Sequence, residues 1–451
     1  MFYHTLFVYR ECLFVSDFVE EKEIESELDF NKVYSLPPNV KLLKHNEVYI
    51  AIYTEGVLWI VLQNEEEKAI FEDIQSQKSI QYLFDNYSEE SVINVIVQLE
   101  AKKFETPVVN ERTDKNVYLY LTNNCNQKCR HCYMFAGEFM IKETPYANWI
   151  EVLTELKAAG CTGVTFTGGE ITVYKGFDKV IRHAHSIGLL VSVLTNGVLW
   201  TDDFIQKLHP YIDEVQVSLD GYDKDSYYAV RQYNGFEKAL YCVKRFSDYK
   251  TKVSIAVTPL YDKLDEFIVG FEPFAKEFLK HYPDVLIKVN HELIKGREVN
   301  TTQSQNGEYK QKLKSMIERI YPDFYTEAFV LNYQDKTIRK NCGFGGISIA
   351  PNGDVYWCNR IHELKSNVNI FRHSIFEIMD MSDKVKDNTS VDNTLICKSC
   401  EIKYICGGGC RINYEGINDY DLHEGEWKYH CNEKKQLLDQ MVLCNEFFFE
   451  E

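Results

Sequence analysis

The chain has 451 residues and a net charge of −18, with 45% hydrophobic and 26% charged residues. This length favours two or three domains, and the composition is that of a folded protein. No cluster of Lys and Arg stands out for phosphate contacts, so nucleic-acid binding is not expected, and no apolar run is long enough for a membrane span. Residues 1–15 are interrupted by Arg10 and Glu11 and lack a small-residue cleavage site, so we expect no secretory signal and a cytoplasmic protein.

Residues 1–108 are predicted to form a small domain without clustered cysteines. The segments 47–53 and 57–63 alternate, are rich in β-branched and aromatic residues, and are separated by Thr-Glu-Gly, which predicts a β-hairpin. Apolar residues at helical spacing then predict about three helices within 65–104. Two strands followed by helices are typical of a winged-helix-like domain.

Residues 109–330 show short apolar strands that alternate with amphipathic helices. This pattern predicts an α/β fold of βα units around a parallel sheet or barrel. The expected strands and their ends lie at 116–122, 163–169, 189–197, 214–221 and 252–258. In such folds the functional site lies at the carboxyl ends of the strands. Four of those ends carry polar residues or glycines, in the sequences TNNC, TGGE, TNG and SLDG, so the sequence predicts one site along that edge.

Fourteen cysteines in a cytoplasmic protein favour metal binding or redox chemistry over disulfides. Four are scattered and are expected to be small buried residues: Cys12, Cys161, Cys242 and Cys444. The other cysteines fall in two groups, at 125–132 and 342–431. Two groups suggest two regions that bear metal clusters.

The first group, Cys125, Cys129 and Cys132, lies in the polar loop CNQKCRHCY after the first strand of the α/β region. Thiolates are the ligands of iron–sulfur clusters, and a four-iron cubane needs four ligands, so three cysteines leave one position open. A zinc site with His131 as the fourth ligand is the alternative. An open position is what allows a cluster to act on a bound molecule.

The spacing Cys-x3-Cys-x-His-Cys in this loop resembles the signature of the radical S-adenosylmethionine (SAM) superfamily. The resemblance implies a partial (β/α)6 TIM barrel in which Cys125, Cys129 and Cys132 hold a [4Fe-4S] cluster whose fourth iron binds SAM. It implies SAM contacts from these residues: His131, Gly168, Gly169, Glu170, Thr195, Asn196, Ser218, Asp220 and Arg231. Glu170 would pair with the methionyl amino group, Ser218 with the ribose or the carboxylate, and Arg231 with the carboxylate.

Residues 331–451 contain short predicted strands, a hairpin around Pro351–Asp354, and the seven cysteines of the second group. A zinc ribbon is one alternative for four of them. The full run resembles the cysteine-rich SPASM domain that follows the barrel in some radical SAM enzymes, which implies two auxiliary [4Fe-4S] clusters and three clusters in the chain. By this resemblance Cys342, Cys358 and Cys410 hold auxiliary cluster I, and Cys397, Cys400, Cys406 and Cys431 hold auxiliary cluster II.

One position departs from a pattern seen in part of that family. Some members have an additional cysteine where this chain has Ser348. Auxiliary cluster I therefore has either an open iron, which would bind a substrate thiolate, or a ligand from elsewhere, such as Cys12 or Cys444.

The order of winged-helix-like domain, barrel and SPASM domain resembles that of peptide maturases with a PqqD-like recognition domain. It implies a precursor peptide whose leader adds as a strand to the exposed hairpin edge of residues 1–108, and a flavodoxin- or ferredoxin-type reductant. The implied reaction removes a hydrogen from a peptide carbon by a 5′-deoxyadenosyl radical and closes a thioether, as in sactipeptides and ranthipeptides. Carbon–carbon crosslinking and formylglycine formation are the alternative reactions, and no proton acceptor can be assigned. An iron–sulfur electron carrier and a zinc-stabilised peptide-binding module are the alternatives without catalysis.

Overall fold

The structure, a computed structural model, describes residues 29–112, 115–138, 141–322, 324–360, 365–411, 431 and 434–445. Residues 1–15 and Cys12, which the sequence analysis considered, lie outside these ranges. Contacts divide the chain into two compact units. The first unit combines 1–112, 325–342 and 388–451, and the second combines 113–324 with 343–387. The domain boundaries predicted near 108 and 330 stay predictions.

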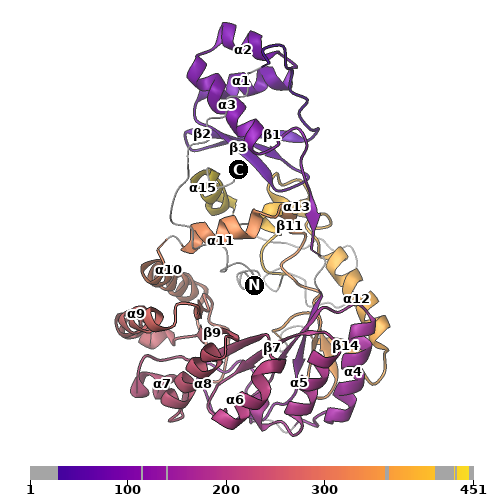
Figure 1. The fold of residues 1–451 in the computed structure, drawn as a ribbon, viewed down its shortest axis with the longest axis vertical. Coiled ribbons are helices and arrows are strands. Elements are labelled where there is room, and N and C mark those ends of the chain that lie inside the picture. The colour runs from indigo at the N-terminus through magenta and orange to yellow at the C-terminus, as the bar shows by residue number, and fades with distance from the viewer. Residues whose placement is uncertain are drawn as a thin grey trace. The chain divides into compact units, whose positions relative to one another are not determined.

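The first unit contains a three-stranded antiparallel sheet in the order β1-β2-β3 (Figure 1). Its elements are β1 (Val40–His45), β2 (Val48–Tyr53), β3 (Leu58–Leu62), α1 (Glu65–Gln75), α2 (Ile80–Asn86) and α3 (Glu89–Ala101). The predicted hairpin is β2–β3, and the predicted helices form, each starting at a side chain that caps it: Asn64, Ser79 or Ser88. Strand β1 was not predicted, because its sequence VKLLKH does not alternate between apolar and polar residues.

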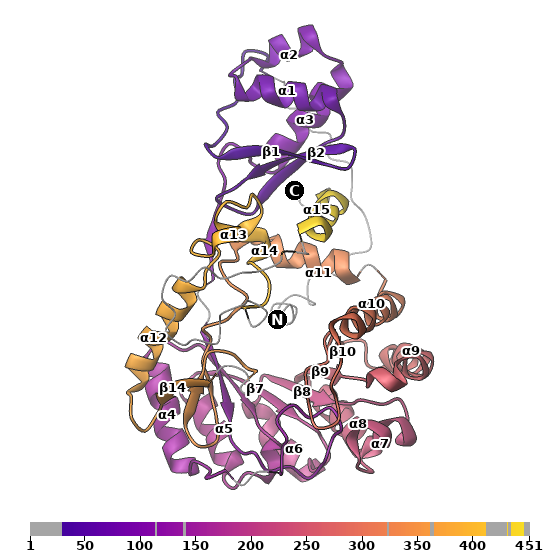
Figure 2. The same ribbon diagram turned by 180° about the vertical axis from the view of Figure 1, so that it is seen from behind.

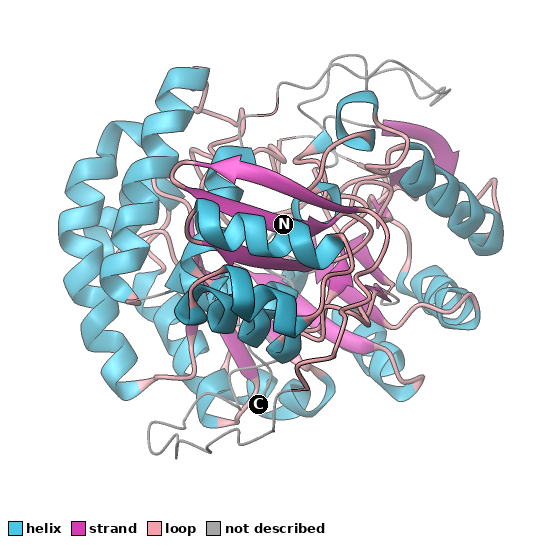
Figure 3. Ribbon diagram, turned by 90° about the horizontal axis from the view of Figure 1, so that it is seen from above, coloured by secondary structure: helices cyan, strands magenta, loops and turns pink. Residues whose placement is uncertain are grey.

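Both faces of this sheet are buried. One face, with Ala51, Ile60 and Leu62, packs on α1–α3 (Figure 3, centre). The other face, with Ile50, Ile52, Trp59 and Val61, shares a core with residues from the C-terminal part of the chain. The remaining elements described with the first unit are β4 (Asn110–Glu111), β11 (Thr337–Ile338), α11 (Phe324–Tyr333), α13 (Leu395–Lys398), α14 (Lys403–Cys406) and α15 (Lys434–Leu443). Burial on both faces explains why β3 is apolar at every position.

The second unit contains six consecutive parallel strands with helices between them. The strands are β5 (Asn116–Tyr120), β6 (Gly163–Thr167), β7 (Leu190–Thr195), β8 (Glu214–Ser218), β9 (Lys252–Val257) and β10 (Leu286–Val289). The helices are α4 (Tyr146–Ala158), α5 (Phe177–Ser186), α6 (Asp202–Leu208), α7 (Lys224–Arg231), α8 (Phe236–Asp248), α9 (Leu264–His281) and α10 (Gln303–Ile320). The predicted α/β fold with a parallel sheet is confirmed, with β7–β10 side by side in Figure 2. The sequence analysis did not identify β10 and α10 individually.

The sheet continues past β5. The strand β12 (Ser348–Ile349) pairs in parallel with β5, and β13 (Asp354–Tyr356) and β14 (Lys365–Asn369) follow in antiparallel order. The hairpin predicted around Pro351–Asp354 is β12–β13, and helix α12 (Ile375–Asn388) follows it. Among the described residues, we find no helix with the length and apolar character that crossing a membrane requires.

Candidate functional site

The cysteine loop follows β5 at the carboxyl end of the parallel sheet. Backbone hydrogen bonds fix it against the end of β6: Gly169 N–H donates to Thr122 O at 2.8 Å, and Glu170 N–H donates to Asn124 O at 2.8 Å. Cys129 is buried, and Cys125 and Cys132 are half-buried. The loop that carries the thiols is therefore an extension of the sheet.

Gly168 and Gly169 allow this close approach of two backbones. Gly168 has φ +153°, and a Cβ on it would lie 2.5 Å from Thr122 O. A Cβ on Gly169 would lie 2.3 Å from Asn124 O. Real Cβ atoms do not approach that closely, so a larger residue at either position would displace the cysteine loop. The structure thus gives these glycines a role in loop placement.

Glu170 joins the ends of β6 and β7. Its buried carboxylate accepts hydrogen bonds from Thr195 Oγ1 at 2.7 Å, from Asn196 N–H at 2.7 Å, and from both the N–H and Oγ1 of Thr172 at 3.1 and 2.7 Å. The carboxylate expected to pair with an ammonium group therefore already has four protein donors. Its contribution to the site includes holding Thr195 and Asn196 in position.

Asn196 reaches from β7 to the cysteine loop. Its Nδ2 donates to Asn126 Oδ1 at 2.8 Å and lies 4.0 Å from Cys125 Sγ. The N–H of Gln127 also donates to Cys125 Sγ, at 3.4 Å. Two amide groups thus point at Cys125 Sγ, and they would stabilise negative charge on this sulfur.

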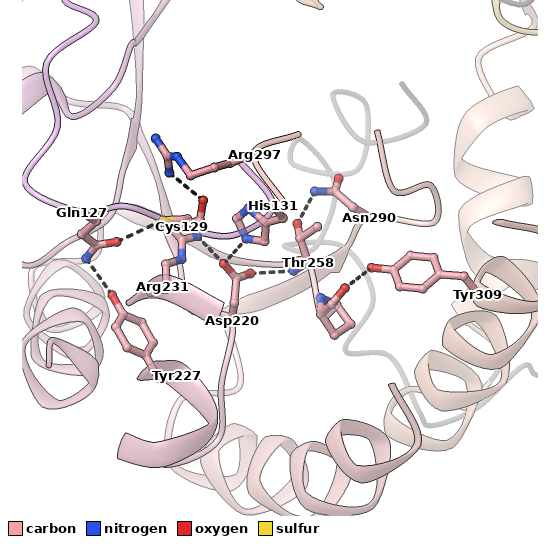
Figure 4. Close-up of polar contacts among 11 residues, drawn as sticks. Gln127, Cys129, His131, Asp220, Tyr227, Arg231, Thr258, Asn290, Arg297 and Tyr309 are labelled. Atoms are coloured by element: carbon pink, nitrogen blue, oxygen red, sulfur yellow. Dashed lines mark hydrogen bonds and ion pairs between the residues drawn. The ribbon is translucent and has the colours of Figure 1, made fainter. Parts of the chain in front are cut away.

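Asp220, just after β8, is the centre of a buried charged group (Figure 4). Its Oδ2 lies 2.8 Å from His131 Nε2 and 2.5 Å from Arg231 Nη2, and its Oδ1 accepts the Thr258 N–H at 2.6 Å. Burial alone would raise the pKa of Asp220, but the positive charge of Arg231 and the contact with His131 lower it below its ordinary value. Asp220 therefore orients both His131 and Arg231.

Arg231, the last residue of α7, connects this group to the cysteines. Its Nη1 lies 3.6 Å from Cys129 Sγ, and its side chain is only 10% exposed. Burial would lower the pKa of Arg231, but Asp220 and the Cys129 thiol raise it above its ordinary value, so the group is a cation. Within the described residues its Nε has no hydrogen-bond partner. A buried cationic donor without a partner fits an anionic ligand.

Two residues of the site, Gln127 and Arg297, were not predicted from the sequence. Gln127 accepts from Cys129 Sγ at 3.6 Å and donates to Tyr227 Oη at 3.0 Å (Figure 4). Arg297 donates to the carbonyls of Cys129 at 2.7 Å and Ala136 at 2.9 Å, which holds the loop from its other side. Gln127 could have been noticed between the cysteines, but no local signal marks Arg297.

A family model of the radical SAM superfamily matches residues 119–268, which include this loop and these strand ends. Residues 119–268 are a radical SAM domain. Such a domain uses a [4Fe-4S] cluster and SAM, as the spacing of the three cysteines predicts.

Three known proteins place this radical SAM domain among its relatives. The sporulation killing factor maturation protein SkfB of Bacillus subtilis (strain 168) is 34% identical over 149 residues, which are 33% of this chain and 36% of SkfB. The mycofactocin maturase MftC of Mycolicibacterium smegmatis (strain ATCC 700084 / mc(2)155) is 27% identical over 310 residues, 64% of this chain and 76% of MftC. The structure of anSMEcpe with bound AdoMet matches with a TM-score of 0.55 at 17% identity, covering 74% of this chain and 99% of that one. The last likeness shows a shared fold.

The thiols of the radical SAM domain lie within electrostatic range of one another. Burial raises the pKa of Cys125 to about 12, and it also raises that of Cys129, with smaller contributions from the neighbouring thiols. Burial therefore favours the protonated form of the Cys125 and Cys129 thiols. Among the described residues, no three His, Cys, Asp or Glu side chains form a site for a single metal ion.

The second cysteine group lies mainly in the first unit. Cys397 belongs to the core shared with the N-terminal sheet, and Cys400 and Cys406 pack against that core. Cys431 is exposed and lies within electrostatic range of Cys400. Cys358 belongs to the second unit, where it is buried close to Tyr118.

A buried arginine organises the loop between Cys406 and Cys410. Arg411 donates from Nε to Thr389 O at 2.7 Å and from Nη1 to the carbonyls of Gly408 and Gly409 at 2.8 and 2.9 Å. Its N–H donates to Cys342 Sγ at 3.4 Å. Residues 407–409 all have positive φ, which three glycines permit. This turn brings Cys410 next to the arginine that contacts Cys342.

Ser218 and Ser348 differ in their surroundings. Ser218 ends β8, is half-buried, and makes no side-chain hydrogen bond that the described residues show. Ser348, on β12 beside Tyr118, is buried, and its hydroxyl also has no partner in the described part of the chain. Cys161, Cys242 and Cys444 are buried, which confirms the prediction for the scattered cysteines that the structure describes.

Proposed function

We propose that the chain is a radical SAM maturase that forms a thioether, from a cysteine sulfur to a carbon, within a ribosomally synthesised precursor peptide. The observation that carries this proposal is the second cysteine group, which lies outside the radical SAM domain and of which Cys397, Cys400 and Cys406 lie in or against a core shared with the N-terminal sheet. In such an enzyme the small sheet would hold the peptide, and clusters on the attached cysteine segment would accept electrons from it. SkfB and MftC, named as a maturation protein and a maturase, support this class.

The residues of the radical SAM domain fit a cluster with a bound anionic partner. Three thiols on one loop leave a coordination position, and Arg231 has an unpartnered Nε beside Cys129. Cys125, Cys129 and Cys132 would hold the cluster. When bound, the cluster and SAM supply one-electron cleavage of the sulfonium and removal of a hydrogen atom from carbon.

The chain's own residues would orient SAM. Arg231, held by Asp220, would bind the SAM carboxylate through its remaining donor, and the Ser218 hydroxyl would bind a second polar group. Asp220 would also fix the ring of His131. The rest of the predicted SAM site, Gly168, Gly169, Glu170, Thr195 and Asn196, would hold the strand ends at the distance that the cofactor needs.

The second cysteine group would hold two auxiliary clusters. Cys342, Cys358 and Cys410 would hold auxiliary cluster I, and Cys397, Cys400, Cys406 and Cys431 would hold auxiliary cluster II. Ser348 contributes no thiol, so a substrate thiolate would complete the first of these. A flavodoxin- or ferredoxin-type protein would supply electrons.

The first test measures metal content and SAM cleavage. In anaerobically prepared protein we expect about twelve irons with matching sulfide per chain, which is three cubanes, and reductive release of 5′-deoxyadenosine and methionine. About four irons together with zinc would remove the auxiliary clusters from the proposal.

The second test identifies the reaction. The protein is co-expressed with each short cysteine-containing peptide encoded near its own gene, and the peptides are analysed by tandem mass spectrometry. A thioether shows loss of two hydrogen atoms and a cysteine that resists alkylation. Loss of two hydrogens with a cysteine that still reacts would indicate a carbon–carbon crosslink, and loss of the sulfur would indicate formylglycine.

A further inference from the structure

A groove between α8 and α9 forms a surface apart from the SAM site. Its volume is about 310 Å³, and its lining is mainly apolar and aromatic, from Leu240, Phe274, Phe278 and Tyr282. Phe274 and Tyr282 are half-buried, so part of each ring is open to solvent. Among the described residues that line the groove, none belongs to the cysteine loop or to the strand ends. An open aromatic surface of this kind suits a partner that brings a flat apolar group.

Aromatic rings run from this groove into the protein. The rings of Phe278 and Tyr282 stack with their centroids 5.0 Å apart, and Phe274 stacks on Phe278 at 6.1 Å. Phe274 also contacts Phe236 of α8 at 5.9 Å, and Phe236 meets Tyr227 of α7 edge-on at 6.1 Å. Each separation is that of rings in direct contact. A continuous series of rings therefore joins the groove to α7, which lies beside α8 in Figures 1 and 2.

The series of rings ends at the cysteine loop. Gln127 Nε2 donates to Tyr227 Oη at 3.0 Å, and Gln127 Oε1 lies 3.6 Å from Cys129 Sγ (Figure 4). Phe236, Tyr227 and Gln127 are all buried. An electron tunnels more readily through bonded and contacting atoms than across open gaps. The groove is thus connected to a thiol of the cysteine loop by a path that suits electron transfer.

The groove also carries an unpaired positive charge. Lys244 lines it, with Nζ 6.0 Å from the centre of the Tyr282 ring, and makes no ion pair within the described residues. Glu277, the carboxylate of the lining, is paired with Lys280 at 2.7 Å. A flavodoxin matches both features, because it presents the apolar edge of a flat flavin ring, and the phosphate of its flavin mononucleotide adds negative charge.

We propose that the groove between α8 and α9 is the docking surface for a flavodoxin-type electron carrier, and that electrons pass from its flavin to the cysteine loop through Phe274, Phe236 and Tyr227. This inference rests on the proposed function for the need of a reductant. One electron leaves the reduced flavin, and one electron reaches the cluster that the cysteine loop would hold. The rings between them keep their oxidation state, and no proton has to cross.

The first measurement follows the electron. Reduced flavodoxin, or dithionite as a small reductant that needs no docking surface, is mixed anaerobically with the full, cluster-loaded chain. Rapid-freeze electron paramagnetic resonance records the reduced cluster whose signal Cys129→Ala lacks. Phe274→Leu removes the ring contacts with Phe236 and Phe278, so it should slow reduction by flavodoxin severalfold and leave reduction by dithionite unchanged. Phe84→Leu, at a half-buried ring of α2, is the matched control and should change neither rate.

The second measurement follows binding and keeps the test decisive if Phe274→Leu is unstable. Oxidised flavodoxin is titrated into the chain by isothermal titration calorimetry. Lys244→Glu should weaken binding about tenfold at low salt and less at high salt. Lys179→Glu makes the same change at an exposed lysine of α5 and should leave binding unchanged.

Four results would overturn the proposal. They are reduction by flavodoxin that ignores Phe274, binding that ignores Lys244, and reduction that Phe274→Leu slows equally with flavodoxin and dithionite. The fourth is a dimer of the chain, measured by light scattering, that Lys244→Glu dissociates, since a second copy would then occupy the groove. A ferredoxin that binds there while flavodoxin does not would also assign the groove to another carrier.

The docking surface and the proposed function can fail separately. If flavodoxin binds and reduces the cluster through these residues but no peptide gains a thioether, the proposed reaction fails and the docking surface stands. If dithionite drives thioether formation while flavodoxin neither binds nor reduces the cluster, the docking surface fails alone.

Discussion

The guanidinium of Arg231 lies between a buried carboxylate and a thiol of the cysteine loop. It approaches Asp220 Oδ2 at 2.5 Å and Cys129 Sγ at 3.6 Å. Neither Arg231 nor Asp220 has much contact with solvent, so the charge of each depends on the other.

Removing one partner of this pair should therefore destabilise the protein strongly. Arg231→Met leaves Asp220 charged and buried, and we expect the free energy of unfolding to fall by about 3–5 kcal/mol. The double variant R231M/D220N should recover part of that loss. As a control, Arg245→Met breaks the more exposed pair with Asp202 and should cost at most about 1 kcal/mol. Urea unfolding followed by circular dichroism measures wild type and the three variants, and equal losses for Arg231→Met and Arg245→Met would contradict the burial argument.

Gly169 should be required for cluster loading. A methyl group there would lie 2.3 Å from Asn124 O and would push the cysteine loop off β6, so Gly169→Ala should lose about four irons, one cubane. Gly307→Ala is the matched control, since a Cβ there meets nothing within 4 Å and the helix gains about 1 kcal/mol. Iron and sulfide analysis of both proteins checks this, and full loading of Gly169→Ala would refute it.

Cys129→Ala should distinguish the iron held by the first cysteine group from the iron held by the second. We expect it to abolish release of 5′-deoxyadenosine and to keep about eight irons per chain, the two auxiliary cubanes. Iron analysis and electron paramagnetic resonance make the measurement. Loss of all iron would show that the cysteines are grouped differently.

Arg411→Gln should reduce iron binding by the second cysteine group, at 342–431. The guanidinium holds two carbonyls of the glycine-rich turn and the carbonyl of Thr389, and Gln is too short to reach them all. We expect a loss of about four irons with SAM cleavage retained. Arg182→Gln, at an exposed guanidinium that donates to Lys207 O, should lose none.

The stability of the first unit should depend on pH through Lys102. Burial lowers the pKa of Lys102 from 10.5 to about 7, so between these values the unfolded chain binds a proton that the folded chain does not. Stability therefore rises with pH across this window, and below pH 7 this contribution no longer changes. Lys102→Met removes the contribution, so the difference between wild type and variant should change by about 2.5 kcal/mol from pH 7.5 to 9.5. A difference that is constant with pH would contradict the lowered pKa.

The cysteine loop and the strand ends were predictable because their chemistry is local in sequence. Thiols among polar neighbours, and glycines with a carboxylate at a strand end, mark a site wherever they occur. The contact of Arg297 with the loop carbonyls was not predictable, since it joins segments far apart in the chain and uses only a common side chain.

In the first unit, too, the features that depend on contacts distant in sequence were not predictable. The alternation of β2 and β3 was visible in the sequence, but β1 was not, because an edge strand that lies over two cores has apolar residues next to each other at Leu42 and Leu43. The outer edge of β3, predicted to be exposed, is closed by Gln98, which accepts the Val61 N–H at 3.0 Å and donates to the Val61 carbonyl at 2.8 Å. This closing depends on a helix that begins after the strand has ended.

The core shared by the N-terminal sheet and the second cysteine group limits how the gene can be divided. A fragment that ends near residue 108 would leave Ile50, Ile52, Trp59 and Val61 bare, and an apolar face of that kind makes proteins aggregate. We therefore expect that the N-terminal sheet cannot be transferred to another enzyme without the segment that carries Cys397, Cys400 and Cys406. Under the proposed function, a cluster held by Cys397, Cys400 and Cys406 would also stabilise this shared core, so that the N-terminal sheet would be complete only in a chain already equipped for electron transfer.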